Sequence, residues 1–355
     1  MQLYIPTKVY SEENCVCNHA PELRALGTKA MIVTGRNSAK KTGALQDVLH
    51  ALGDMPYVLF DRVEENPSIE TVMEARTLAV TEQVDFFIGI GGGSPMDAAK
   101  AIALMAANPE ETEAVLYTPK ALQYYPIACV PTTCGTGSEV TPYAILTRHV
   151  HKTKKSISHK IFPALALLDA KYLKTMPCTG LVNTCVDALA HLLESYLNTG
   201  SNELNRLYSR EGLYLWAQFK DRLLTDTLVD ADYPRMLHAS MVAGMAITHT
   251  GTSLPHGMSY PVTYHMGIPH GRAVGMFLGG FVESYGNQEE AEQAVKLLGF
   301  ASATDFRKYL NCLLGMVEVP RELLQAGAEK LLQDPAKRKN YPFPLTVEKV
   351  IHMAN

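Results

Sequence analysis

The first half of the chain alternates between short apolar runs and longer segments in which apolar residues recur with helical spacing. The apolar runs, which are rich in β-branched and aromatic residues, lie at 30–34, 57–60, 84–90, 126–130 and 164–168. Unbroken apolar runs of this kind are typical of strands buried on both faces of a parallel sheet. The segments between them with the helical period lie at 40–52, 68–82 and 94–107. This order predicts an open, doubly wound α/β sheet.

The second half of the chain changes character after about residue 175. Stretches rich in Leu, Ala and Met follow one another with little strand-like alternation. They predict helices at 184–198, 202–224, 234–249, 272–285, 289–299, 303–315 and 320–333. A chain of 355 residues also exceeds the usual size of a single core. We therefore predict an α/β domain over 1–175 and an all-helical domain over 176–355.

Composition and charge narrow the class of protein. Hydrophobic residues make up 47% of the chain, and the formal net charge is −4. The chain lacks a long basic run, so we expect neither nucleic acid nor a membrane surface as a partner. Its most apolar runs are too short to span a bilayer. The seven scattered cysteines are typical of reduced thiols, and with no signal-peptide pattern at the amino terminus we expect a cytoplasmic protein.

A glycine-rich turn, "GIGGGSPMDAAK" at 89–100, leads from a predicted strand into a predicted helix. We predict Ser94 as the helix N-cap, with Asp97 in capping-box spacing after it. Free backbone amides at the positive end of a helix form an anion site, which favours phosphate binding. Ser94 stands where a dinucleotide fingerprint has its third glycine, so a tight turn without a ligand stays open.

Two further turns are predicted at the same sheet edge. "PTTCGTGSEVT" at 131–141 offers hydroxyls and amides, which suits a ligand with several phosphates and sugars, although an ordinary loop also fits. The first predicted strand ends in "GRNSAKK", which holds Arg36, Lys40 and Lys41 but no acid. A carboxylate there would bind a ribose diol, whereas cations favour a 2′-phosphate. A basic helix start at the surface explains this turn equally well.

The histidines form the second candidate site. Asp187 and His191 are spaced i, i+4 on a predicted helix and share a face, which allows a metal pair or a local hydrogen bond. His256 and His270 each lie within a "PHG" triplet, and we expect the glycines to allow close backbone approach and unusual dihedrals. One carboxylate and three imidazoles suit Zn²⁺ or Fe²⁺. His265 is interpreted as a loop or pocket-rim residue.

Four motifs, in this order, resemble those of the iron-containing (group III) alcohol dehydrogenases. They are "GGGSPMDAAK", "PTTCGTGSEVT", "DALAHLLESYL" and the paired "PHG" histidines. The resemblance implies a Rossmann-like dinucleotide-binding domain over 1–175 and a helical metal- and substrate-binding domain over 176–355. It implies the metal ligands Asp187, His191, His256 and His270. It also implies cofactor-binding residues at Gly35, Ser38, Lys41, Gly91, Gly92, Gly93, Ser94, Asp97, Thr132, Thr133, Ser138, Thr141 and Lys154.

Position 260 departs from the family pattern. Many relatives have a second histidine four residues after the His256 equivalent, where this chain has Tyr260. Tyr260 or His265 could replace that imidazole in a proton relay. Gly35 stands where NAD-preferring members often have an acid, so the resemblance implies NADP(H) over NAD(H).

The expected function is hydride transfer between NADP(H) and a primary alcohol or its aldehyde, dependent on Fe²⁺ or Zn²⁺, in a homodimer. Three alternatives stay open. One is a metal- and NAD-dependent lyase like the dehydroquinate synthases, although the helical motifs lack the Arg and Lys set that a polyanionic substrate needs. Another is a polyol oxidoreductase like the glycerol dehydrogenases. The third is a non-catalytic nucleotide-binding protein.

Overall fold

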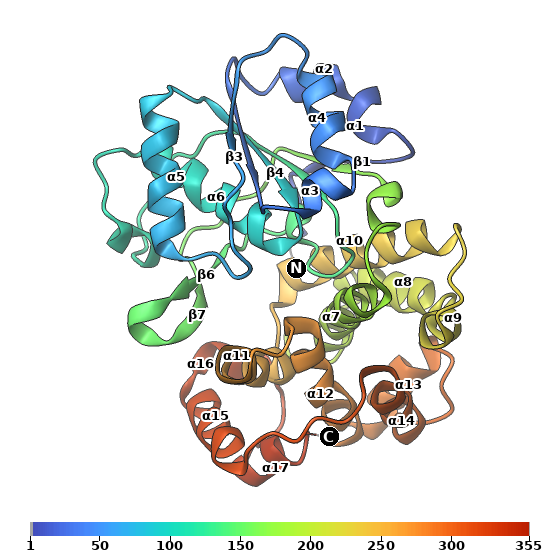
Figure 1. The fold of residues 1–355 in the computed structure, drawn as a ribbon. Coiled ribbons are helices and arrows are strands. Elements are labelled where there is room, and N and C mark those ends of the chain that lie inside the picture. Colours follow the sequence, from blue (N-terminus) through green and yellow to red (C-terminus); the bar gives the residue numbers. More distant parts are fainter. Residues whose placement is uncertain (1–2, 355) are drawn as a thin grey trace. The chain divides into compact units, whose positions relative to one another are not determined.

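The computed structural model describes residues 3–354, apart from the side chains of residues 336 and 337 (Figure 1). The chain divides into two compact units. The α/β unit comprises residues 5–133 and 137–176, and the helical unit comprises 134–136 and 177–354, together with residues 3 and 4. A short piece of the 131–141 turn therefore groups with the helical unit, although its flanks belong to the α/β unit.

The α/β unit is built on a six-stranded sheet in which all neighbouring strands are parallel. The strand order is β1-β8-β5-β4-β2-β3. The strands are β1 (Lys8–Ser11), β2 (Ala30–Thr34), β3 (Tyr57–Phe60), β4 (Phe86–Gly91), β5 (Ile127–Pro131) and β8 (Leu165–Leu168). The predicted doubly wound sheet is confirmed, and each predicted strand lies within two residues of its predicted start.

Helices cover both faces of this sheet because successive strand residues point to opposite sides. On β4, Phe87 packs with α5 (Ile69–Thr81) and α6 (Gly93–Ala107). Phe86 belongs to the opposite core, which is lined by α1, α2 and α4. The bounds of these and the neighbouring short helices are α1 (Cys15–Asn18), α2 (Ala20–Arg24), α3 (Ser38–Lys41), α4 (Ala44–Leu52), η1 (Glu113–Tyr117), η2 (Ser138–Val140), η3 (His149–His151) and η4 (Ala170–Leu173).

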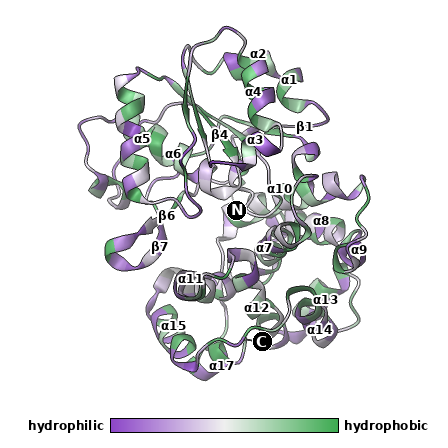
Figure 2. Cartoon of the chain, viewed as in Figure 1, coloured by the Kyte–Doolittle hydropathy of each residue, from purple (hydrophilic) through white to green (hydrophobic). Residues whose placement is uncertain are grey.

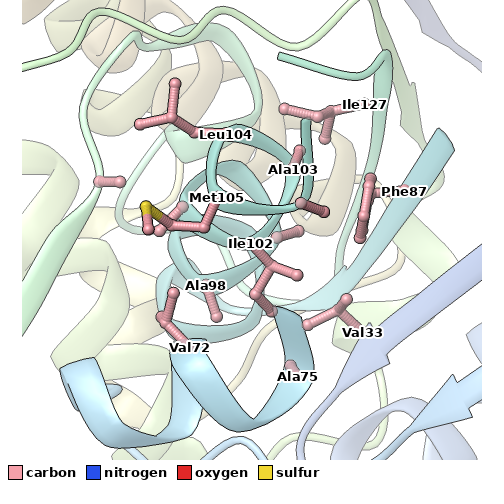
Figure 3. Close-up of a cluster of buried hydrophobic side chains, with 14 of the residues drawn as sticks. Val33, Val72, Ala75, Phe87, Ala98, Ile102, Ala103, Leu104, Met105 and Ile127 are labelled. Carbon is pink, nitrogen blue, oxygen red and sulfur yellow. The ribbon is translucent and has the colours of Figure 1, made fainter. Parts of the chain in front are cut away.

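The core between the sheet and α6 is formed by small and branched side chains. Figure 3 shows Ile102 and Ala98 of α6 between Val72 of α5 and the sheet residues Val33 and Phe87. All five are fully buried. Full burial of one branched apolar side chain stabilises the folded state by about 1.5–3 kcal/mol. The packing of this layer therefore holds α6, including its first turn, in place against the sheet. In Figure 2 the central strand β4 is green, whereas α5 carries both green and purple, as expected for a helix with one apolar face.

In the helical unit, α7 (Cys178–Tyr196) packs against five other helices (Figure 1). These are α8 (Asn205–Ala217), α10 (Asp232–Thr250), α11 (Leu254–Met266), α12 (His270–Glu283) and α14 (Ala303–Leu314). The remaining helices are α9 (Lys220–Thr225), α13 (Gln288–Leu297), α15 (Arg321–Gln333), α16 (Pro335–Arg338) and α17 (Val347–Ile351). α7 is buried continuously from Cys185 to its last residue. The polar side chains of this stretch, among them Asp187, His191 and Glu194, therefore lie in the interior. None of the helices that the structure describes is both long and apolar enough to cross a membrane.

Several local predictions are wrong. Ser94 is not the N-cap of α6: the helix begins at Gly93, and the Ser94 hydroxyl accepts a hydrogen bond from the Asn66 amide instead. The predicted helix at 202–224 is two helices, α8 and α9. The segment 254–266 was not predicted as helical, yet it forms α11, which contains Pro261. The edge strand β1 and the antiparallel hairpin of β6 (Ile145–Arg148) and β7 (Thr153–Ser156) also escaped prediction because they are short and half exposed.

Candidate metal centre and cofactor loops

Two candidate ligands lie one turn apart on α7. Asp187 and His191 are both buried, with exposed fractions of 3% and 6%. An ionised carboxylate is rarely buried unless it is paired with a charge or bound to a metal. The Oδ1 atom of Asp187 faces the Nε2 atom of His191 at 3.9 Å, so the i, i+4 spacing does place both groups on one side of the helix.

The two "PHG" histidines approach the same carboxylate oxygen. His256 lies in the first turn of α11, and His270 is the first residue of α12. Their Nε2 atoms lie 3.3 Å and 3.6 Å from Asp187 Oδ1. A tetrahedral ion with ligand bonds of about 2.0–2.1 Å separates neighbouring ligand atoms by about 3.3–3.4 Å. The spacing around Asp187 Oδ1 therefore fits a shared cation.

The buried atoms of this cluster point to the same conclusion. Asp187 Oδ1 and His256 Nε2 are buried, and neither makes a hydrogen bond in the described part of the chain. Ligand atoms of Asp187, His256 and His270 all lie within 4.8 Å of one another. His191 is not in this group of three, although its ring stacks on that of His256 at a centroid distance of 4.5 Å. The structure thus brings three of the four predicted ligands together and places the fourth beside them.

Hydrogen bonds fix the orientation of two of these rings. His256 Nδ1 lies 3.0 Å from Glu194 Oε1, and His191 Nδ1 lies 3.2 Å from the Gly135 carbonyl oxygen. Each Nδ1 faces an acceptor and so carries the proton, which leaves the Nε2 lone pair directed toward Asp187. Metal-binding histidines usually have such a partner on the second nitrogen. Sequence reasoning missed both partners. The signal for Glu194 was its position three residues after His191 on the same helix.

The electrostatics of the cluster keep Asp187 ionised and favour positive charge beside it. Burial opposes ionisation of Asp187, but the imidazoles of His191, His270 and His256 outweigh it and hold the pKa of Asp187 below its ordinary range. Burial lowers the pKa of His191 to about 4. Burial also acts to lower the pKa of His256, but Glu194 and Asp187 outweigh it and raise this pKa to about 9. The site therefore attracts positive charge at the position of His256 Nε2.

The two candidates for a proton relay lie in different surroundings. The Tyr260 ring stacks beside His270, with ring centroids 5.9 Å apart. His265 is exposed in the last turn of α11 and packs against Tyr264. It lies nine positions after His256 on the helix, which corresponds to about 13 Å along the helix axis. The structure brings Tyr260 to the histidine cluster and leaves His265 away from it.

The glycines beside the two histidines do not adopt unusual dihedrals, so that expectation is wrong. Gly257 and Gly271 lie inside helices, and neither has a positive φ. Close approach does explain Gly271, because a Cβ atom there would lie 1.7 Å from the backbone oxygen of Asn183 on α7. The prolines have a helical explanation, since Pro255 lies in the first turn of α11 and Pro269 is the N-cap of α12.

The predicted phosphate loop lies at the carboxyl ends of β4 and β5. Gly91 has a φ of +145°, a conformation that L side chains rarely adopt. Its carbonyl oxygen accepts a 2.8 Å hydrogen bond from the Thr132 amide, which joins the two turns. A Cβ atom on Gly92 would lie 3.1 Å from the Thr133 side chain. The start of α6 at Gly93 therefore leaves its first amides free for an anion. The Thr132 hydroxyl is buried and has no hydrogen-bond partner in the described structure.

The side chains of Asp97 and Ser138 are joined by a hydrogen bond and belong to a buried polar network. Asp97 accepts hydrogen bonds from the Ser138 hydroxyl at 2.6 Å and from the Ile145 amide at 2.9 Å. The fully buried Lys100 ammonium donates to the carbonyl oxygens of Ser138 and Tyr143 at 2.7 Å and 2.8 Å. Burial raises the pKa of Asp97 and lowers that of Lys100, and their mutual attraction opposes both shifts. Sequence reasoning missed Lys100, although a lysine in the apolar run of α6 was a usable signal.

The other predicted cofactor residues lie around this edge of the sheet. Lys154 donates to the Asn66 side chain at 2.9 Å. Thr141 is buried directly after η2, while Ser38 and Lys41 are exposed on α3, which follows β2 and Gly35.

One cation of the basic turn is already paired. Lys40 lies 2.7 Å from Asp61, the residue that follows β3. The sequence of the turn alone contains no acid, but the neighbouring strand brings one to it. This pairing reduces the positive charge that a 2′-phosphate would meet there.

Comparisons with known proteins identify the family of this chain. Residues 6–170 match the family model described as iron-containing alcohol dehydrogenase, and residues 181–338 match that of the Fe-containing alcohol dehydrogenase family, C-terminal. The chain belongs to the iron-containing alcohol dehydrogenase family. A solved structure of an iron-containing alcohol dehydrogenase from Thermotoga maritima is similar over 99% of this chain and 98% of its own, with 35% identity and a TM-score of 0.91.

Two curated relatives of this alcohol dehydrogenase family differ in the activities that their names state. A mitochondrial hydroxyacid-oxoacid transhydrogenase of Caenorhabditis briggsae is 33% identical over 68% of this chain. The match spans only 58% of that relative's length. An NADPH-dependent butanol dehydrogenase of Clostridium saccharobutylicum is 28% identical over 89% of this chain and 81% of its own. Membership of the alcohol dehydrogenase family thus leaves the substrate open.

Proposed function

We propose that this chain is a metal-dependent oxidoreductase that transfers a hydride between NADP(H) and a primary alcohol or its aldehyde. The observation that carries the proposal is the convergence of His256, His270 and His191 on one buried oxygen of Asp187, at 3.3, 3.6 and 3.9 Å. The names of the matched relatives are those of dehydrogenases, reductases and a transhydrogenase. These names favour hydride transfer over the lyase alternative.

In this proposal Asp187, His191, His256 and His270 hold Fe²⁺ or Zn²⁺. When bound, the metal acts as a Lewis acid on the substrate oxygen, and the nicotinamide supplies or accepts the hydride. Burial of Asp187, His191 and His256 excludes water and so strengthens their attraction for the cation. The Tyr260 phenol, whose ring stacks beside His270, is the proposed group that passes a proton to or from the substrate oxygen.

The α/β unit would hold the dinucleotide. The first amides of α6, beginning at Gly93, suit the pyrophosphate, and the unpaired Thr132 hydroxyl is a donor beside them. NADP(H) is proposed because Arg36 and Lys41 are exposed next to Gly35, where no carboxylate stands. The relative named as NADPH-dependent supports this preference. The Lys40–Asp61 pair works against it, so the preference is expected to be moderate. The cytoplasmic location and the homodimer stay predictions.

A turnover assay tests the proposed function. The protein is stripped with a chelator, reloaded with Fe²⁺ or Zn²⁺, and supplied with NADPH or NADH and a panel of aldehydes and 2-oxo acids. We expect loss of reduced-nicotinamide absorbance only after reloading, faster with NADPH and with aldehydes. A preference for 2-oxo acids would support an activity like that named for the transhydrogenase relative. Full turnover by metal-free protein would contradict the proposal.

Matched histidine variants test the ligand set in the same assay. His256→Ala and His270→Ala should each lose bound metal and reduce kcat/KM by at least about 1,000-fold, because removal of one ligand breaks the coordination sphere. His352→Ala removes an exposed imidazole of the same unit and should leave both quantities unchanged. An active His256→Ala protein without metal would remove the basis of the proposal.

A further inference from the structure

Glu194 is a buried charge in the helical unit that no metal ligand role explains. Its side chain is fully buried on α7, three residues after His191 and seven after Asp187. This spacing places all three residues on one face of the helix. Glutamate is almost never fully buried unless it is paired, because removing its charge from water is unfavourable. The hydrogen-bond partners of its two carboxylate oxygens therefore indicate the role of this buried charge.

Both oxygens of Glu194 bond to the start of α11. Oε2 accepts a hydrogen bond from the Ser253 amide, and Oε1 accepts one from the His256 amide at 3.0 Å. Ser253 is the N-cap residue of α11, but its own side chain caps no amide of the helix. The carboxylate of α7 thus supplies the cap that α11 lacks, at the helix end where negative charge is favourable.

The same carboxylate also holds the His256 ring. Oε1 lies 3.0 Å from Nδ1, while Nε2 on the other side of the ring lies 3.3 Å from Asp187 Oδ1. Backbone and side chain of His256 are therefore fixed by one group. His191 shows a weaker version of this arrangement, because its Nδ1 faces the uncharged carbonyl oxygen of Gly135.

We propose that Glu194 is a positioning residue, which orients His256 and fixes the proton on its Nδ1 so that Nε2 is presented to the metal. This inference rests on the metal-dependent function proposed above. A carboxylate partner increases the electron density that the imidazole offers to a cation. Glu194 also balances charge, since Asp187 and Glu194 together carry two negative charges, equal in number to the charge of a divalent ion.

The test compares Glu194→Gln with a control that removes a different buried carboxylate. Glutamine has nearly the same shape, but it carries no charge and has only one accepting oxygen for the three donors. Asp232→Asn is the matched control. Asp232 is fully buried in the same unit, on α10, and accepts hydrogen bonds from Arg222 and the Val229 amide. Both variants should lower the melting temperature, because each leaves buried donors unsatisfied.

Metal affinity and the Co²⁺ spectrum distinguish a role of Glu194 in positioning His256 from a role that is limited to capping α11. Zn²⁺ affinity is measured by competition with a chromophoric chelator, and the visible absorption of Co²⁺-loaded protein reports the ligand geometry. We expect Glu194→Gln to bind Zn²⁺ about 10–100-fold more weakly and to change the Co²⁺ spectrum. Asp232→Asn should match the wild type in both. Glu194→Asp keeps the charge on a shorter side chain, so its affinity should lie between those of the wild type and Glu194→Gln.

Each outcome bears on the inference. Wild-type affinity and an unchanged Co²⁺ spectrum in Glu194→Gln would show that Glu194 only caps α11 and would overturn the proposal. If Glu194→Gln does not fold, the same measurement on Glu194→Asp decides, and unchanged affinity there has the same consequence. A wild-type protein that binds neither ion would refute the metal-dependent function, and the role of Glu194 with it. Tight metal binding without turnover would refute only the proposed activity.

Discussion

At the residue scale, the sequence was sufficient to predict the candidate metal ligands. It was not sufficient to identify the buried charged residues that hold other groups in position. Asp187 and the "PHG" histidines were identifiable because their types and spacing are unusual along the chain. Glu194 and Lys100 were not identified, because the function of a buried charge depends on what it contacts across tens of residues. Glu194 reaches Ser253, and Lys100 reaches the Ser138 carbonyl oxygen. Such partners become visible only when the fold is known.

Lys100 gives the prediction that belongs to this scale. Lys100→Met keeps most of the side-chain volume but leaves Asp97 and the carbonyl oxygens of Ser138 and Tyr143 without their cation. Breaking a buried charged network in this way costs about 3–5 kcal/mol. We expect a loss of that size in the free energy of unfolding, measured by urea denaturation. Lys155→Met, which removes an exposed lysine of β7, should change it by less than about 0.5 kcal/mol. Equal losses in both variants would show that the network around Lys100 contributes nothing.

At the scale of elements, buried strands and long helices follow from the sequence, whereas edges and helix starts do not. The central strand β4 is entirely buried and its apolar run was clear. β1 lies at the sheet edge with its terminal residues exposed, so its four residues carry little pattern. α11 was not predicted because its sequence contains proline and glycine, which usually interrupt helices. Its start is instead stabilised by Glu194 from α7, a contact that local propensity cannot reveal.

A substitution at Gly271 tests whether the close approach of α12 to α7 is required. Gly271→Ala would place a Cβ atom 1.7 Å from the backbone oxygen of Asn183, so α12 would have to move away from α7 and carry His270 with it. We expect a loss of about 3 kcal/mol or more in stability together with weaker metal binding, from denaturation and chelator competition. Gly327→Ala is the control, because there the nearest atoms are side-chain carbons of Met258 and Pro261 at 3.3 Å. Its stability should change by about 1 kcal/mol or less. Normal metal affinity in Gly271→Ala would show that the close packing of α12 does not set the position of His270.

At the scale of the whole molecule, the proposed function assigns a separate task to each of the two units. The change in sequence character after about residue 175 anticipated a parallel α/β sheet followed by helices. It did not anticipate that residues 134–136, in a turn after β5, group with the helices. This piece includes Gly135, whose carbonyl oxygen faces His191. A periodicity argument assigns each segment to its sequence neighbours, so it could not show that a turn of the sheet contributes to the helical unit.

This separation predicts that each ligand protects its own unit from hydrogen exchange. A ligand that binds only the folded state at 100 times its Kd stabilises it by about 2.7 kcal/mol, which slows exchange through the affected opening about 100-fold. Zn²⁺ added to chelator-treated protein should therefore slow exchange in α7, in the first turns of α11 and α12 and near Gly135. NADPH should slow exchange at 91–97 and in the 131–133 segment. The measurement is deuterium uptake of peptic peptides by mass spectrometry.

The His256→Ala variant is the control. It should abolish the effect of Zn²⁺ on exchange and retain the effect of NADPH. Zn²⁺ protection confined to the β4–α6 turn would place the ion elsewhere and contradict the assignment of the ligands to the helical unit.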